Sequence, residues 1–281
     1  MEKLLSKISA KADKATAVFR KIPLKIDAHY NFLQSFFIEV SNFFIFTGRF
    51  FKEAIKPPYE FNELFKQSYL IGYKSLPLVG ITGFIMGLVL TVQSRPTLAE
   101  FGAESWLPAM ISVSIVREIG PVITALICAG KVGSGIGAEL ASMRVTEQID
   151  AMEVSGTNPL KYVIVTRVLA TIFMLPVLTV FNDSISMLGS FVGVNIKGDV
   201  SFHLYFSQAL AQISFTDVFP SLVKTLFFGL AIGLIASYKG YNSNKGTEGV
   251  GQAANSSVVM ASLMVFIIDM ISVQVTSIFL N

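Results

Sequence analysis

Five long apolar stretches constrain this chain more than any other feature of its sequence. They lie at about residues 76–93, 107–130, 162–194, 218–238 and 254–280. Each is long enough to cross roughly 30 Å of hydrocarbon as a helix that rises about 1.5 Å per residue. Charged residues make up only 15% of the chain, and they gather outside these stretches. The sequence therefore predicts an all-α, polytopic membrane helix bundle with five transmembrane helices.

The region before the first apolar stretch is basic. Residues 1–75 contain 12 Lys or Arg and seven Asp or Glu. We interpret residues 1–29 as a basic cytoplasmic segment and 30–75 as interfacial or elbow helices, followed by the membrane domain at 76–281. A basic segment beside apolar spans favours the anionic surface of a membrane over nucleic acid as its partner.

The Phe-rich part of that region, residues 30–56, has two possible placements. Glu39 and Arg49 interrupt its apolar side chains, and Pro57-Pro58 follows it directly. This pattern favours an N-terminal amphipathic helix that lies in the inner membrane interface. A sixth transmembrane span is the alternative.

Basic residues also predict how the spans are oriented. If the N-terminus is inside, the inner segments 1–75, 131–161 and 239–252 hold 17 Lys or Arg. The outer loops then hold only Arg95 and Lys197. This asymmetry follows the positive-inside rule. We therefore expect a multi-pass protein of the bacterial inner (plasma) membrane, with a cytoplasmic N-terminus and a C-terminus on the outer side.

Four helices of the predicted bundle contain glycines spaced four residues apart. Small residues at this spacing let the backbones of membrane helices approach closely. Their recurrence predicts a compact bundle but does not indicate what it transports. The four motifs are Gly83/Gly87, Gly133/Gly137, Gly189/Gly193 and Gly229/Gly233.

Ionisable residues inside the spans are the first candidate for a functional site, because each costs about 2.5–3.5 kcal/mol to insert. Counting along the helices places five of the six in one layer of the outer half of the membrane. They form either an ion-pair network that locks the bundle or the polar lining of a cavity. The five are Arg117, Glu118, Asp183, Lys224 and Asp269, and the sixth is Arg167.

Glu118 is the strongest candidate for the cavity lining. Gly120-Pro121 follows it, and Pro121 cannot donate to the carbonyl of Arg117, so the helix should bend there. Neighbouring residues of a helix point about 100° apart, so Arg117 and Glu118 need different partners. Our hypothesis is that Glu118 faces the cavity.

A short acidic helix is predicted between the second and third spans, at about residues 144–156. Val145, Ile149 and Met152 fall on one face of it. Acidic residues occupy the rest, and an anionic membrane surface would repel them. Docking into a groove on a cytoplasmic partner fits this pattern better.

The sequence offers no recognisable catalytic or cofactor site. It has no Walker A motif, and its single cysteine and two distant histidines do not form a metal-binding pattern. We therefore expect no cofactor and no enzymatic chemistry. If the protein consumes ATP, a separate subunit hydrolyses it.

Residues 117–167 contain three long motifs, R-E-x-G-P, A-E-x-x-x-M-x-V-T-E-Q-I-D-A-M-E and N-P. In these motifs the chain resembles the MlaE/YrbE-type permeases, the membrane subunits of ABC transporters that work with MCE-domain proteins on lipids. The resemblance extends more loosely from about residue 60 to the C-terminus. It implies a homodimer with a phospholipid cavity that lies between the two permeases and opens outward. It also implies a cytoplasmic ATPase and an MCE-domain protein on the outer face.

The resemblance also assigns roles to residues by their position in the motifs. The lipid cavity would be bordered by Glu118 and Arg117, and lined by Leu90, Gln93, Leu98 and Phe101. The ATPase would contact Arg144, Glu147, Asp150 and Glu153. Asp183, Lys224 and Asp269 would remain the buried polar layer. Arg95-Pro96 departs from relatives whose sequence is apolar at this point.

The sequence is also compatible with two other functional classes. An ion- or proton-coupled carrier would also explain buried acids, although we find no internal repeat of the kind such carriers often have. A structural scaffold that holds an ATPase is the third possibility. Dependence of transport on ATP discriminates among the three.

Overall fold

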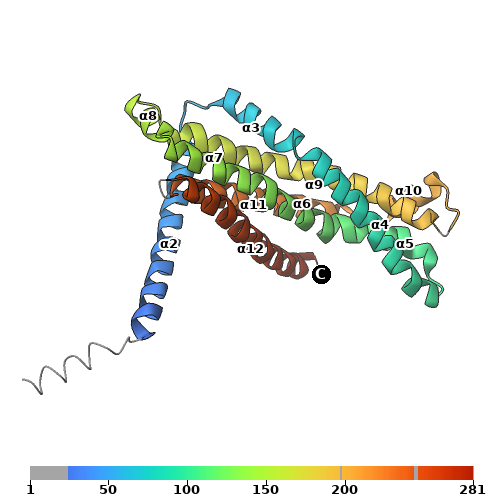
Figure 1. Ribbon diagram of the computed structural model, residues 1–281. Coiled ribbons are helices and arrows are strands. Elements are labelled where there is room, and N and C mark those ends of the chain that lie inside the picture. The colour runs from blue at the N-terminus through green and yellow to red at the C-terminus, as the bar shows by residue number, and fades with distance from the viewer. Residues whose placement is uncertain (1–24, 197, 244–245, 281) are drawn as a thin grey trace, which may run out of the picture. The chain divides into compact units, whose positions relative to one another are not determined.

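The computed structural model describes residues 25–196, 198–243 and 246–280, and they are almost entirely helical (Figure 1). The chain divides into two units after Arg49, and the membrane domain belongs to the second, Phe50–Asn281. Helix α2 covers Lys25–Ala54. Five helical segments of the described residues are long and apolar enough to cross a membrane, and α2 is not among them. The predicted all-α membrane bundle with five spans is confirmed.

The predicted division of the region before residue 76 is not decided by these helices. Most of the basic segment 1–29 lies outside the described residues. The Phe-rich segment 30–56 belongs to the longer helix α2, and its position at a membrane interface stays a prediction.

The candidate spans are longer than the apolar stretches that predict them. The first contains α3 (Phe61–Tyr73) and α4 (Leu76–Glu100). The second runs through η1 (Glu104–Trp106), α5 (Leu107–Ser114), η2 (Ile115–Ile119), α6 (Gly120–Cys128), η3 (Ala129–Gly133) and α7 (Ser134–Val145). The third contains η4 (Leu160–Val165) and α9 (Thr166–Asn195). The last two are α11 (Phe215–Tyr241) and α12 (Thr247–Leu280), and the short helices α8 (Gln148–Val154) and α10 (Phe202–Ala211) lie between spans.

The first span does not end at Arg95-Pro96, where its apolar stretch ends. Pro96 lies inside α4, which continues to Glu100. The Arg95 guanidinium donates to the main-chain carbonyl of Val194 over 3.0 Å and lies 3.8 Å from the Glu104 carboxylate. The helix can continue because its charged residue finds partners at the end of α9 and in the following turn.

The second span contains a π-helical turn directly before Gly120-Pro121, where the sequence predicts a bend. This turn, η2, covers Ile115–Ile119 and directly precedes Gly120-Pro121. A π turn changes the hydrogen-bond spacing and so tolerates a proline that cannot donate. It also places Arg117 and Glu118 in the irregular segment, which sets the directions of their side chains.

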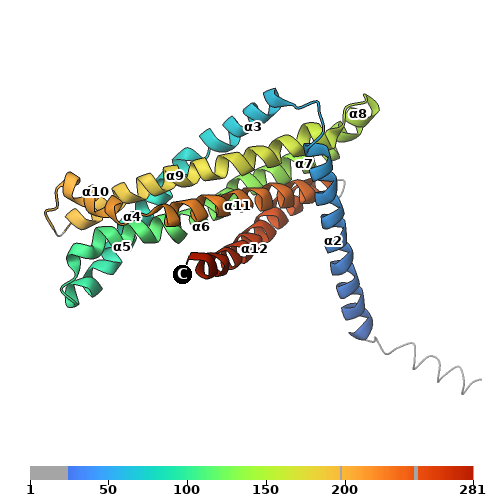
Figure 2. The same cartoon turned by 180° about the vertical axis from the view of Figure 1, so that it is seen from behind.

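Glycine motifs hold α4 against α9, and the two helices lie side by side in Figures 1 and 2. A Cβ atom at Gly87 would overlap the main chain of Ser186, and one at Gly189 would overlap the main chain of Phe84. Each motif thus faces the other helix. The predicted close packing is confirmed for this pair, and Gly229 makes a similar approach from α11 to α9.

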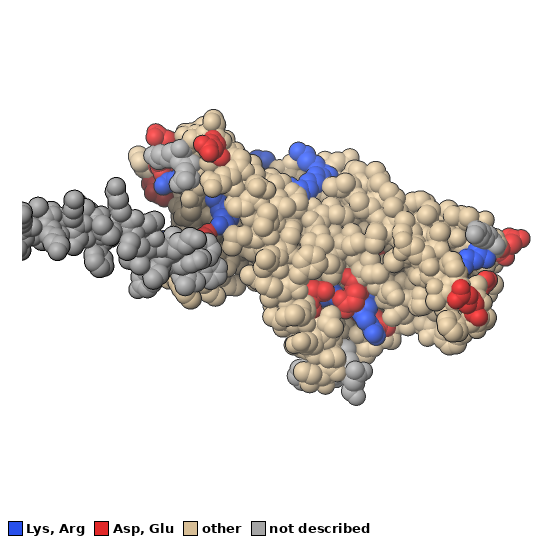
Figure 3. All heavy atoms as spheres, turned by 60° about the horizontal axis from the view of Figure 1, so that its bottom comes forward, with Lys and Arg blue, Asp and Glu red and all other residues tan. Residues whose placement is uncertain are grey.

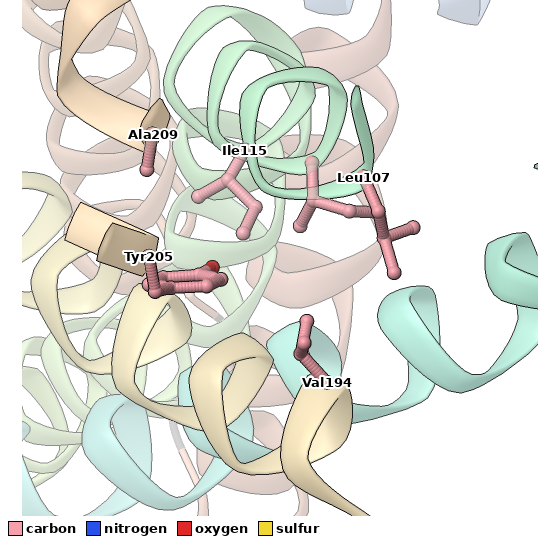
Figure 4. Packing of buried hydrophobic residues seen from close by; sticks show 6 residues of the cluster. Leu107, Ile115, Val194, Tyr205 and Ala209 are labelled. Atoms are coloured by element: carbon pink, nitrogen blue, oxygen red, sulfur yellow. The ribbon is translucent and has the colours of Figure 1, made fainter. Parts of the chain in front are cut away.

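A hydrophobic cluster packs α10 against α5 and the end of α9. It consists of Leu107, Ile111, Ile115, Val194, Tyr205 and Ala209, and Figure 4 shows the Tyr205 ring lying among these side chains. Burial raises the pKa of the Tyr205 phenol, which therefore stays neutral. The cluster fixes the end of the bundle at which Arg95 also lies.

Candidate functional site

A buried lysine connects three spans in the middle of the bundle. Lys224 of α11 is 2% exposed, and its ammonium lies 2.5 Å from Glu118 of η2 and 3.0 Å from Asp269 of α12. Hydrogen bonds between ionised partners are stronger than neutral ones. The three residues come from segments far apart in the sequence, so the cluster ties α11 and α12 to the second span.

Arg117 pairs with a residue that the sequence analysis did not identify. Its Nε donates to Asp217 over 3.0 Å and its Nη2 over 2.5 Å. Asp217 also accepts from the main-chain nitrogen and hydroxyl of Ser214 in a capping box at the start of α11. Arg117 and Glu118 thus have separate partners, as their angular separation predicts. A Ser-x-x-Asp pattern before an apolar run was the signal that could have identified Asp217.

Four residues of these two ion-pair clusters line one cavity of about 210 Å³: Arg117, Asp217, Glu118 and Lys224. Its wall combines charged side chains with hydroxyl groups from α11 and α12. Figure 3 shows how sparse the charged atoms are on the face that it displays, where they gather in a few groups within a broad uncharged surface. The lining residues with charges or hydroxyls are Arg117, Glu118, Thr216, Asp217, Ser221, Lys224, Ser272, Thr276 and Ser277.

Asp183 lies apart from these ion pairs although it belongs to the same predicted layer. It is 9% exposed, and its carboxylate lies where a Cβ atom of Gly120 would be. Its Oδ1 has no hydrogen-bond partner among the described residues. Of the five residues in the predicted layer, ion pairs join Glu118, Lys224 and Asp269, while Arg117 pairs with Asp217.

The sixth ionisable residue of the spans, Arg167, has a structural environment of its own. It is almost fully buried and donates to the Glu139 carboxylate over 2.7 Å and to the carbonyl of Val163 over 2.9 Å. These bonds join α9 to α7. Arg167 is therefore a cross-link between the second and third spans and not a member of the cavity.

The four predicted lipid contacts near the end of the first span do not line the 210 Å³ cavity. Leu90 and Leu98 pack on the Tyr205 cluster. Gln93 and Phe101 are exposed, Phe101 to 79%. Their contact with lipid stays a prediction, and within this single chain they are separate from Glu118.

The predicted docking helix is shorter than residues 144–156. Helix α7 continues through Val145, Glu147 has a left-handed φ of 57°, and α8 covers only Gln148–Val154. The left-handed residue separates the two helices, so Arg144 and Glu147 lie before α8 and not on it. Gly156, with a φ of 79°, follows the end of α8.

The charged residues of this segment are nevertheless connected. Arg144 forms an ion pair with Asp150 and lies 5.9 Å from the centre of the Tyr241 ring. The Tyr241 hydroxyl donates to Glu153 over 3.4 Å. These contacts tie α7, α8 and the end of α11 into one small surface, which we call the α8 surface.

Comparison with known sequences identifies the family to which this fold and site belong. Residues 64–275 match the family described as Permease MlaE, which covers all five candidate spans except their outermost residues. The chain belongs to the MlaE permease family. Its Arg117, Glu118, Lys224 and Asp269 all lie within the matched region.

Individual relatives agree with this assignment over most of their length. The chain is 35% identical to the intermembrane phospholipid transport system permease protein MlaE of Haemophilus influenzae over 250 residues, which is 86% of this chain and 95% of that protein. It is 38% identical over 228 residues to a probable ABC transporter permease protein of Rickettsia prowazekii, covering 81% and 88% of the two chains. A probable ABC transporter permease protein of Synechocystis is 33% identical over 224 residues, or 80% and 85%. The chain is a multi-pass membrane permease of this family.

Proposed function

We propose that this chain is the permease subunit of an ABC transporter that moves phospholipid between membranes. The main observation behind the proposal is the cavity at Glu118, which places charges and hydroxyls beside long apolar helices. A phospholipid needs both environments, because its phosphate is charged and its acyl chains are apolar. The name of the Haemophilus influenzae relative, an intermembrane phospholipid transport permease, points to the same substrate.

A homodimer would complete the cavity. Helix α12 forms part of the cavity wall, yet only 11% of its most apolar 18-residue segment is buried within the chain. The corresponding segment of α11 is 56% buried. A span with so little intrachain contact has a face free for another helix. We propose that two copies meet near α12, so that phospholipid lies between them in a cavity that opens outward.

The proposed transport cycle requires partners that this chain does not supply. A cytoplasmic ATPase would dock on the α8 surface, where Asp150 and Glu153 are held by Arg144 and Tyr241. The positive-inside rule supports a cytoplasmic position for this surface, because the inner segments are basic. An MCE-domain protein would cover the outer face. Gln93 and Phe101 lie near that end of the first span and would meet the lipid as it passes.

Site-specific photocrosslinking tests whether phospholipid occupies the cavity. A photoreactive residue at Thr276, which lines the cavity, should crosslink phospholipid that remains in the purified complex. A photoreactive residue at Leu226 serves as the control, because this exposed side chain of α11 does not line the cavity. Detergent exchange should remove lipid from Leu226 and leave it at Thr276.

Mass spectrometry of the purified complex tests the partners at the same time. The proposal expects an ATPase and phospholipid to co-purify with the chain. A complex that contains neither, or equal lipid crosslinking at Thr276 and Leu226, would contradict the proposal and favour an ion-coupled carrier.

A further inference from the structure

A second cavity lies between α4 and α9 and has a different character from the one at Glu118. It has a volume of about 520 Å³, and none of its eight lining residues is polar or charged. It shares no lining residue with the Glu118 cavity. Such an apolar groove on two membrane spans is suited to a hydrocarbon chain.

A glycine sets the floor of the groove. Gly80 is one of its lining residues, and a Cβ atom added there would lie 3.2 Å from the ring of Phe181 on α9. This is a tight contact, so the missing side chain lets the Phe181 ring pack directly on α4. The two helices stay in contact through Gly83 and Gly87, and the apolar groove lies open over Gly80 and Phe181.

The length of the groove corresponds to one leaflet of a bilayer. It extends from Leu76, the first residue of α4, to Ile85. Nine residues of helix rise about 14 Å, close to half of a hydrocarbon core of roughly 30 Å. Tyr69 and Tyr73 stack on each other at 5.0 Å, exposed at the same end of α4. Exposed tyrosines mark the level of the lipid headgroups, so the groove begins at the interface.

Two ammonium groups lie at this entrance. Lys74 is exposed and precedes the first residue of the groove by two positions. The ammonium of Lys131, from η3, donates a hydrogen bond to the main-chain carbonyl of Lys74. The entrance therefore carries positive charge at the level of the lipid headgroups, next to the apolar groove.

We propose that this groove binds one acyl chain of an anionic phospholipid, with its phosphate held by Lys74 and Lys131. The groove length, the aromatic residues at its entrance and the two cations are independent features that agree on this ligand. The bound lipid would stabilise the contact between the first and third spans. The site does not depend on transport, so it can be present even if the cavity at Glu118 carries a different substrate.

Native mass spectrometry of the full-length protein from mixed-lipid nanodiscs tests the site. The probes are phosphatidylglycerol and phosphatidylcholine with identical acyl chains. The parent protein should retain phosphatidylglycerol preferentially. Lys74→Gln should reduce this preference about five-fold, because one lysine near an anionic surface contributes about that factor.

Lys66→Gln is the matched control. Lys66 lies on α3 eight residues before Lys74, which is about 12 Å along a helix, and its ammonium lies 3.6 Å from Glu63. Its removal should leave the preference unchanged. An equal loss in both variants would show non-specific attraction to a basic surface and would overturn the proposal, as would an unchanged Lys74→Gln variant.

Two variants of the groove itself complete the test. Gly80→Leu should displace the Phe181 ring into the groove and reduce retention of both lipids, since neither acyl chain could then lie in it. Ile81→Cys places a thiol on an exposed lining residue, and the protein should stay monomeric on the gel after mild oxidation. A disulfide between two copies through this thiol would mean that a second permease covers the groove, and would refute the lipid site.

Discussion

Replacing Lys224 by methionine should destabilise the protein strongly. The substitution keeps an unbranched side chain that is one atom shorter, but removes the cation shared by Glu118 and Asp269. Removing one partner of a buried ion pair typically costs 3–5 kcal/mol, because the other charge stays buried without compensation. Lys224 is 2% exposed and Asp269 is 21% exposed, but Glu118 is 38% exposed and partly solvated.

Partial solvation of Glu118 places the expected loss at the lower end of that range, about 3 kcal/mol. By the scaling of soluble domains, this corresponds to a decrease in Tm of roughly 6–12 °C. The triple variant Lys224→Met, Glu118→Gln, Asp269→Asn should recover most of the loss. Replacing a whole buried ion pair by hydrophobic residues of similar volume is often tolerated without cost, and Gln and Asn likewise leave no buried charge without a partner.

The single cysteine provides the assay. Cys128 is buried in α6, so a thiol-reactive dye should label it only when the bundle opens on heating. Arg117→Met is the comparison variant: Arg117 is 60% exposed, and its partner Asp217, although only 5% exposed, keeps two hydrogen bonds from Ser214, so this variant should lose less stability than Lys224→Met. The reasoning is refuted if Lys224→Met unfolds at the temperature of the parent, or if the triple variant is less stable than the single one.

Three further predictions concern other parts of the bundle. Gly87→Ala should lower Tm, at a cost of about 1–3 kcal/mol, since the added methyl group would overlap the main chain of α9. Gly130→Ala is the control and should be tolerated, because the space around Gly130 is open. Equal Tm values for the two variants would contradict the prediction. Tyr205→Ala should cost about 3–5 kcal/mol in the same melting assay by leaving a hole in a fully buried cluster. Asp150→Ala removes the ion pair with Arg144 and should reduce ATPase recovery in pull-downs about ten-fold, a loss of about 1.4 kcal/mol. Glu248→Ala, which changes an exposed acidic residue, should leave ATPase recovery unchanged.

Features set by local sequence patterns were predictable. Five apolar stretches gave the number of candidate spans, and paired glycines predicted the close helix packing that α4 and α9 show. Pro121 marked the position of a π turn. In each case the cause lies within one helix, in its hydropathy, its small residues or a missing N–H group.

Features that depend on tertiary contacts were not predictable. The predicted layer grouped Glu118, Lys224 and Asp269, but it did not show that Lys224 pairs with both carboxylates. Asp217 was missed because it lies near the first turn of α11 and looks like a capping residue until Arg117 approaches it. Helix bounds differ for the same reason, since interhelical bonds of Arg95 extend α4 beyond its apolar stretch.

The break before α8 was also not predictable, because the sequence around it has a helical pattern. Residues 144–156 have a helical distribution of apolar side chains, yet Glu147 has a left-handed backbone. A non-glycine residue in this conformation is uncommon and costs free energy. Contacts of the surrounding chain, such as the Arg144–Asp150 pair, hold the break, and they cannot be read from spacing alone.

Lipid transfer by the reconstituted complex tests the central claim most directly. The permease with its co-purified ATPase is placed in donor vesicles, and fluorescent phospholipid reaching acceptor membranes is measured with and without ATP. We predict ATP-dependent transfer that falls sharply in Glu118→Ala, in protein whose assembly and expression match the parent. Transfer that needs no ATPase, or an intact rate in assembled Glu118→Ala, would contradict a lipid permease that works through this cavity.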